Sequence, residues 1–196
     1  MPDTIRDGKG RGFLAAVNDG QQLETRSIQI QHIASHSETD ETAFCAHMHF
    51  TQDVGAADEY VGSILYTGSK RVLIERVVAW TDEGAGNLAY VQFLKNPTGL
   101  AGGAALTPAN LNFSSNVTIG VTCLHQDDVV AVPITVTAAG EDFMSEAIPS
   151  NSTVSAEFNG SVILGIGDAF LIVGNCATAG SLIRASVFFF EADIGG

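Results

Sequence analysis

Hydrophobic and polar residues alternate with a period of two along much of this chain. Over residues 44–51 the apolar positions are Phe44, Ala46, Met48 and Phe50, and the positions between them are Cys45, His47, His49 and Thr51. Successive side chains of a β-strand point to opposite faces of the sheet. This segment is therefore predicted to be a strand with one apolar face and one more polar face.

Further strands are predicted wherever a short apolar run lies between turn residues. The predicted ranges are 60–67, 72–80, 88–94, 117–124, 129–136, 153–158, 161–164, 170–173 and 182–190. Helical periodicity would fit only residues 72–80, and the β-branched residues there favour a strand. Residues 99–110 are rich in Gly and Ala and are predicted to be a loop. Many short strands at this spacing predict an all-β sandwich or barrel.

The first part of the chain has a different pattern. Glycine occupies every second position between residues 8 and 12, which disfavours a helix. A turn sequence at 18–20 then separates the apolar residues 13–17 from residues 22–26. We interpret these residues as two short strands that form a hairpin or an extended arm. Because two strands are only marginally stable alone, the arm is expected to lie on another surface.

The charge is unevenly placed as well. The 196 residues have a net charge of −13, but residues 1–30 contain four basic and four acidic residues, so the excess lies in residues 31–196. Binding of nucleic acid or of an anionic membrane requires clustered Lys and Arg, so this composition argues against both partners. We divide the chain into a neutral N-terminal arm, residues 1–27, and an acidic β-sandwich body, residues 28–196.

Targeting signals and cysteine pairs are not evident. No apolar region typical of a secretory signal occurs near residue 1, and the longest apolar stretches are too short to cross a bilayer. The three cysteines, Cys45, Cys123 and Cys176, are an odd number without Cys-x-x-Cys spacing. We therefore expect reduced thiols and synthesis in the cytosol.

The pair His47 and His49 is the strongest candidate for a metal site. On a strand both imidazoles lie on one face, together with the side chain of Cys45. The pair resembles the first metal motif of cupins. However, Glu41 stands where that motif has glycine, Asp53 follows where it has glutamate, and the second His motif is missing. We therefore favour a polar strand that faces solvent or another subunit, and we predict neither a metal site nor a cofactor.

Sequence motifs for catalysis are also missing. The glycine clusters at 8–12 and 165–167 lack the following helix and the Lys-Ser/Thr pair of a phosphate-binding loop. Neighbouring carboxylates at 82–83, 127–128 and 141–142 are predicted to lie in solvated loops, since a catalytic pair must face across a cleft. No Gly-x-Ser-x-Gly elbow occurs. We therefore predict no catalytic residues and a protein that is not an enzyme.

Three consecutive phenylalanines, Phe188, Phe189 and Phe190, lie near the end of the chain. In a strand, Phe189 points to the opposite side from its two neighbours. A large apolar side chain is seldom left on the outside of a protein without reason. We therefore name Phe189 as a candidate subunit contact, although burial in the core of a two-sided sandwich is the favoured interpretation.

Several stretches resemble the virion structural proteins of tailed bacteriophages. The first is Asp7-Gly8-Lys9-Gly10-Arg11-Gly12-Phe13-Leu14-Ala15-Ala16-Val17, and the others are residues 106–112, 162–170 and 186–191. The chain looks most like a capsid decoration, or cement, protein. This resemblance implies a jelly-roll-like body with an arm, assembly as a trimer, and the major capsid protein as partner. It also implies a place on the capsid surface of a particle made in the bacterial cytoplasm.

The resemblance and the arm together give a docking hypothesis. Residues 5–27 are expected to bind the major capsid protein or a neighbouring subunit by adding main-chain hydrogen bonds to a sheet. The predicted contact residues are Arg6, Lys9, Arg11, Phe13, Leu14, Val17 and Phe189. The first alternative is a head-fibre or tail-associated protein that binds the host surface, and the second is a cupin-like metalloprotein.

Overall fold

The structure is a computed structural model that describes residues 4–6, 14–16, 42–126 and 133–192. The chain forms two compact units, residues 1–31 and residues 32–196, and each is described by itself. Every regular element in the described ranges is a β-strand.

The N-terminal unit contains two short antiparallel strands, β1 (Thr4–Arg6) and β2 (Leu14–Ala16). The predicted strand at 13–17 is therefore present as β2. Strand β2 pairs with the upstream strand β1. The predicted second strand at 22–26 lies outside the described residues.

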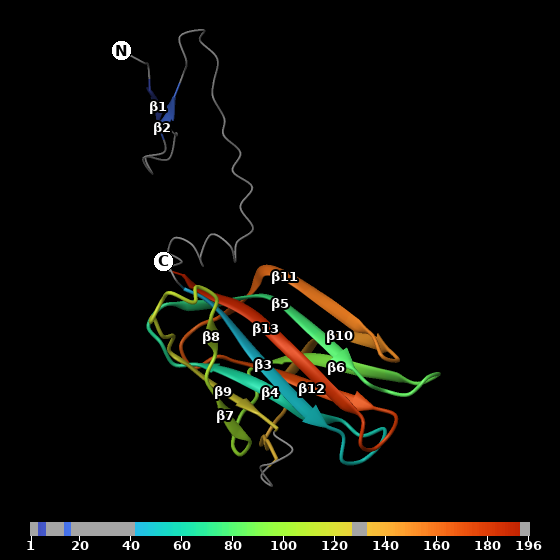
Figure 1. The fold of residues 1–196 in the computed structure, drawn as a ribbon. Coiled ribbons are helices and arrows are strands. Elements are labelled where there is room, and N and C mark those ends of the chain that lie inside the picture. Colours follow the sequence, from blue (N-terminus) through green and yellow to red (C-terminus); the bar gives the residue numbers. More distant parts are fainter. Residues whose placement is uncertain (1–3, 7–13, 17–41, 127–132, 193–196) are drawn as a thin grey trace. The chain divides into compact units, whose positions relative to one another are not determined.

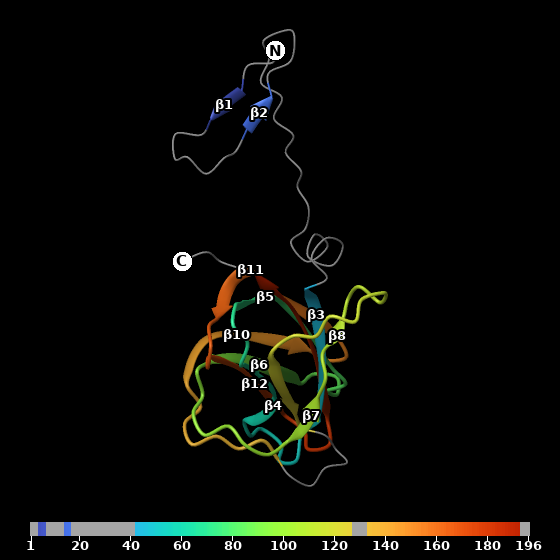
Figure 2. The same ribbon diagram turned by 90° about the vertical axis from the view of Figure 1, so that its left-hand side faces the viewer.

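The described residues of the body form eleven strands in two antiparallel sheets (Figures 1 and 2). They are β3 (Ala43–Thr51), β4 (Glu59–Tyr66), β5 (Arg71–Thr81), β6 (Leu88–Lys95), β7 (Ala104–Leu106), β8 (Ala109–Asn110), β9 (Val121–His125), β10 (Glu141–Pro149), β11 (Thr153–Leu164), β12 (Ala169–Cys176) and β13 (Leu182–Ala192). One sheet has the order β10-β6-β12-β4-β9-β7, and the other has the order β11-β5-β13-β3-β8.

The order of the long strands is that of a jelly roll. The first long strand, β3, pairs with the last, β13, which in turn pairs with β5, and β5 pairs with β11. In the facing sheet β4 pairs with β12, β12 with β6, and β6 with β10. Eight strands connected in this way form the two Greek keys of a jelly roll. The expected all-β, jelly-roll-like sandwich is confirmed, and β7 to β9 are inserted between β6 and β10.

Several predictions differ in detail from the structure. The predicted loop at 99–110 contains the short strands β7 and β8, and of the predicted strand at 117–124 only residues 121–124 lie in a strand, β9. Strand β10 was missed because it is an exposed edge strand that begins with Glu141 and Asp142, and acidic residues have low strand preference. Of the predicted strand at 129–136, only residues 133–136 are described, and they contribute an isolated bridge between Thr135 and Ala101. The predicted strands at 153–158 and 161–164 are one strand, β11, interrupted by a bulge.

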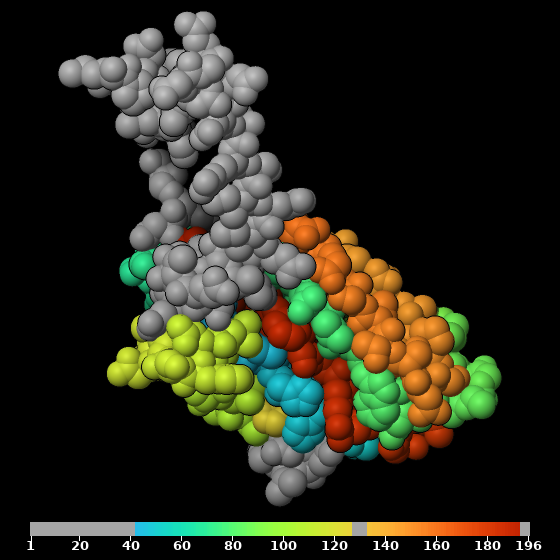
Figure 3. Space-filling view, turned by 45° about the horizontal axis from the view of Figure 1, so that its top comes forward, coloured from blue at the N-terminus to red at the C-terminus, as the bar shows by residue number. Residues whose placement is uncertain are grey.

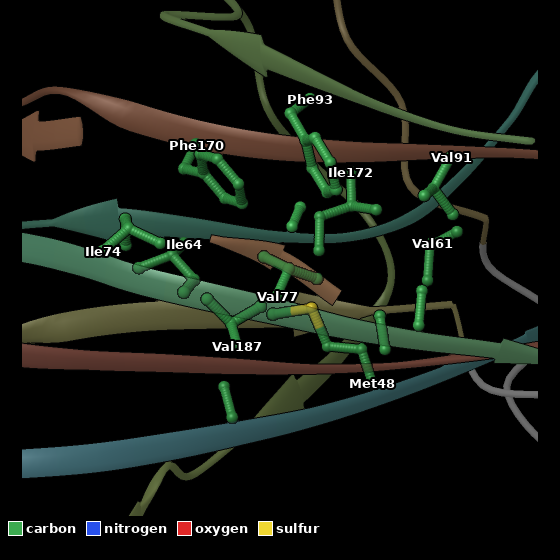
Figure 4. Packing of buried hydrophobic residues seen from close by; sticks show 14 of the residues in the cluster. Met48, Val61, Ile64, Ile74, Val77, Val91, Phe93, Phe170, Ile172 and Val187 are labelled. Carbon is green, nitrogen blue, oxygen red and sulfur yellow. The ribbon is translucent and has the colours of Figure 1, made fainter. Parts of the chain in front are cut away.

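The core lies between the two sheets (Figure 4). Met48 and Val187 from the five-stranded sheet meet Ile64 and Ile172 from the six-stranded sheet, and all four side chains are fully buried. Gly62 on β4 permits this close approach, because a Cβ there would lie 2.3 Å from Sδ of Met48. The apolar face predicted from the alternation at 44–51 therefore faces the interior, as expected.

The three cysteines are expected to react slowly with thiol reagents in the native protein. All three are free thiols, and burial raises the pKa of Cys123 to about 12 and that of Cys176 to about 11. Burial also raises the pKa of Cys45, partly offset by the nearby Arg76 cation. Because the thiolate is the reactive form, we expect a thiol reagent at pH 8 to label the native protein slowly and only at Cys45. Unfolding in denaturant should expose all three, and rapid native labelling of two or more would contradict the structure.

Candidate interaction surface

The outer face of the five-stranded sheet presents an ordered set of polar and aromatic side chains. Three rows run across β3, β13, β5 and β11 in register: Cys45, Phe188, Arg76 and Glu157; His47, Ser186, Val78 and Ser155; and His49, Arg184, Trp80 and Thr153. We call these twelve residues the outer sheet face. Figure 3 shows the four strands side by side as blue, red, green and orange bands. Only one of the twelve residues, Glu157, is acidic.

Two arginines of the outer sheet face lie over aromatic rings. The guanidinium carbon of Arg76 is 4.6 Å from the ring centroid of Phe188, and that of Arg184 is 5.6 Å from the ring of Trp80. These arginines are two of the five basic residues after residue 30. Arginine and aromatic residues are enriched in protein interfaces, and Trp and Arg are prominent among binding hot spots. The face therefore has the composition of a binding surface on a body that is acidic overall.

The Arg76 side chain also has unused bonding capacity. Its Nε atom is buried, and no hydrogen-bond partner is found for it within the part of the chain that the structure describes. In register, Glu157 of β11 lies next to Arg76, and the Glu157 carboxylate accepts a hydrogen bond from the Ser155 hydroxyl. A partner that approaches this row would meet the Arg76 guanidinium above the Phe188 ring, while the buried Nε donor lies beneath the surface.

The histidines lie as the alternation predicted, on the face opposite to the core. The Nδ1 atom of His47 is 2.9 Å from the Ser186 hydroxyl, and the ring centroids of His49 and His125 are 4.9 Å apart. Burial lowers the pKa of His47, and the positive charges of His49, Arg184 and His125 lower it further. Within the described ranges, no group of three or more His, Cys, Asp or Glu residues has a geometry that could hold a metal ion. The polar strand is thus present, and the two His side chains belong to the outer sheet face.

The predicted arm contacts fall in the N-terminal unit. Arg6 ends β1 and Leu14 begins β2, and the two residues are directly paired across the strands. The other four predicted arm contacts, Lys9, Arg11, Phe13 and Val17, lie outside the described residues. The six arm contacts stay predictions.

The predicted subunit contact at Phe189 needs correction. Its side chain has no exposed surface, and its ring lies 6.1 Å from that of Phe44 in the core. The register of pairing between β13 and β5 shifts between Phe188 and Phe189. Phe188 is the half-exposed ring on the outer face, beneath Arg76. Phe189 therefore points to the opposite side from Phe188, as expected, and its burial in the core is confirmed.

The neighbouring carboxylates were only partly understood from sequence. The Glu83 side chain is buried and accepts hydrogen bonds from the backbone N–H of Thr178 and from the Asn87 amide, so it is not solvated. Glu141 is exposed as expected, but it lies on a strand and forms a 2.8 Å ion pair with Lys95. The pair at 127–128 lies outside the described residues.

The outer sheet face was missed as a unit because its rows join strands that are distant in sequence. The signal available in the sequence was the alternation itself. Within residues 76–80 and 184–188, every second position is Arg, Val, Trp, Ser or Phe, and those residues are less buried than the residues between them. Only the register of pairing shows that Arg76 lies beside Phe188 and that Arg184 lies beside Trp80.

Comparisons with known proteins add no support to the resemblance to phage virion proteins, which is therefore based only on the sequence stretches quoted above. No protein-family model matches this chain, and no curated protein matches it. Among the described residues, no helix is long and apolar enough to span a membrane.

Proposed function

We propose that this protein is a structural virion protein that binds the outside of a tailed-phage capsid and stabilises it. The main observation in support of this proposal is that the chain has both a jelly-roll body and an N-terminal unit. The body holds the whole net charge of −13, whereas residues 1–30 are neutral. One unit is suited to attachment, and the other to facing solvent.

In this proposal, the arm at residues 1–27 docks on the major capsid protein. Strands β1 and β2 form an antiparallel pair, and a strand pair of this kind can accept a further strand at an edge. Strand addition would supply main-chain hydrogen bonds, and side chains such as Arg6 and Leu14 would set the register. The acidic bodies repel one another at long range, which keeps the protein soluble at high copy number. Assembly into trimers is part of the proposal because the resembling proteins commonly form trimers.

Localisation on the particle tests this proposal directly. Purified protein mixed with capsids that lack it should co-sediment at a fixed ratio to the major capsid protein. An image reconstruction should then place the jelly-roll density on the outer capsid surface, with the arm against the shell. Protein found only at the tail, or not bound to particles at all, would contradict the proposal.

A second candidate function is binding to the host surface as part of a head fibre or tail. The observation that favours it is the outer sheet face, where half-exposed Trp80 and Phe188 lie beneath arginines. Aromatic rings of this kind can stack on sugars or on other aromatic groups. This function predicts that the purified protein binds intact host cells and that Trp80→Ala removes that binding. Decoration of the capsid predicts no such binding.

A further inference from the structure

The longest uncharged stretch of the chain runs from residue 96 to residue 126. These 31 residues include no Asp, Glu, Lys or Arg, although charged residues make up 16% of the chain. At that average the stretch would contain about five charged residues. It holds β7, β8 and β9, which are inserted between β6 and β10 of the jelly roll. We call it the neutral insertion.

The neutral insertion forms one lateral side of the sandwich. Strand β7 is the last strand of one sheet and β8 is the last of the other, so both sheets end in it. Figure 3 shows its yellow-green residues as one block beside β3. Its exposed residues are all uncharged and most are small, apolar or hydroxylated, including Ala101, Ala105, Thr107, Ala109 and Val117. The edge strands of the opposite side, β10 and β11, contain four acidic residues, so the two sides differ sharply in charge.

Phe113 stands at the tip of the loop that follows β8 and is 93% exposed. The loop is fixed by local hydrogen bonds. The backbone N–H of Asn112 donates to Oδ1 of Asn110 at 2.9 Å, and that of Ser114 donates to Oδ1 of Asn112 at 3.1 Å. The Asn110 amide also donates to the carbonyl of Val117 at 3.2 Å. Figure 2 shows the loop projecting from the body next to β8. A ring held in place before binding loses little conformational freedom when a partner covers it.

We infer that the neutral insertion, with Phe113 as its anchor, is the surface through which copies of this protein associate with one another. Two copies with a charge of −13 each repel wherever acidic sides meet, because like charges placed together cost several kcal/mol. A basic partner would be drawn to the acidic surface instead. The neutral side is where an equally acidic partner can approach, and a second copy is such a partner.

The contact is made by side chains rather than by extension of a sheet. Strands β7 and β8 have three and two residues, and such short edges offer few main-chain hydrogen bonds. Aromatic anchors, by contrast, account for much of the binding energy at interfaces whose centres are poor in charge. The Phe113 ring is the exposed aromatic group that fits this role within the neutral insertion.

Sedimentation velocity of the full chain, without capsids, tests this inference. At near-physiological salt the protein should associate as its concentration rises, and Phe113→Ser should weaken association at least tenfold. The matched control is Ile166→Ser, which removes another apolar side chain, 72% exposed, from the loop between β11 and β12. This control should leave association unchanged. Thr118→Glu should weaken association at low salt and should recover as salt screens the added charge.

Three outcomes would overturn the inference. The full chain could stay monomeric at the highest concentration reached, or Phe113→Ser could associate like the unaltered protein. The third outcome is that the control Ile166→Ser weakens association as much as Phe113→Ser does. A photoreactive benzoylphenylalanine in place of Phe113 gives a second readout, because it should cross-link to another copy of the chain. When capsids are added, cross-linking to the capsid protein alone would also contradict the inference. Because self-association is measured without capsids, failure here is separate from failure of capsid binding.

Discussion

Removal of residues 1–27 is expected to abolish capsid binding while the body stays folded. The jelly roll begins at β3, and its described strands, core and pairings lie between residues 42 and 192. The arm has no net charge and contains the two strands β1 and β2. Co-sedimentation with capsids should fall to background, whereas the β-type circular dichroism and the unfolding midpoint should remain close to those of the full chain.

Matched controls separate docking by the arm from a general effect of its charge. The double variant Lys9→Ser and Arg11→Ser keeps the main chain available for strand addition, so it should weaken binding without abolishing it. The variant Leu14→Pro removes a main-chain donor from β2 and should be nearly as severe as the deletion. If the shortened protein still bound capsids at the original ratio, the docking hypothesis would be wrong.

The largest expected effect on stability follows from truncation of Phe170. Its side chain is fully buried, and its ring lies 5.8 Å from Phe93, 6.1 Å from Phe158 and 6.2 Å from Phe143. Phe170→Ala leaves a cavity between the sheets and removes these contacts, so the free energy of unfolding should fall by about 3–5 kcal/mol. Urea unfolding followed by circular dichroism measures this loss.

Phe143→Ala is the matched control for this prediction. Phe143 contacts the same aromatic group but lies on the edge strand β10 and is 38% exposed. Because less surface is buried there, its truncation should cost clearly less, about 1–2 kcal/mol. Equal losses for the two variants would show that the core is not arranged as described.

Which side of a single strand is buried could be predicted from sequence alone. In β3, the alternation of Phe44, Ala46, Met48 and Phe50 with polar residues identified the buried side correctly. Alternation is a local property, because the period of two follows from the geometry of one extended chain. The same reasoning found most of the long strands and the all-β class. Composition likewise separated a neutral first segment from an acidic body.

Strand β10 could not be predicted in this way. As an edge strand it pairs on one side only and exposes most of its residues, so its sequence lacks a buried apolar face. The subunit contact predicted for Phe189 was wrong for a different reason. Phe189 follows the buried positions Ile183, Ala185 and Val187 of β13 at intervals of two, so the alternation itself placed its side chain in the core.

The sequence by itself determined most of the long strands, which side of most of them is apolar, and where the charge lies. The tertiary structure alone decided how those strands lie together. His47 and Ser186 are 139 residues apart and yet form a 2.9 Å contact on the outer sheet face. The uncharged residues 96–126 became one side of the sandwich because β7 and β8 end different sheets. Both results depend on pairing between distant segments, which is selected by packing of the whole core rather than by any local pattern.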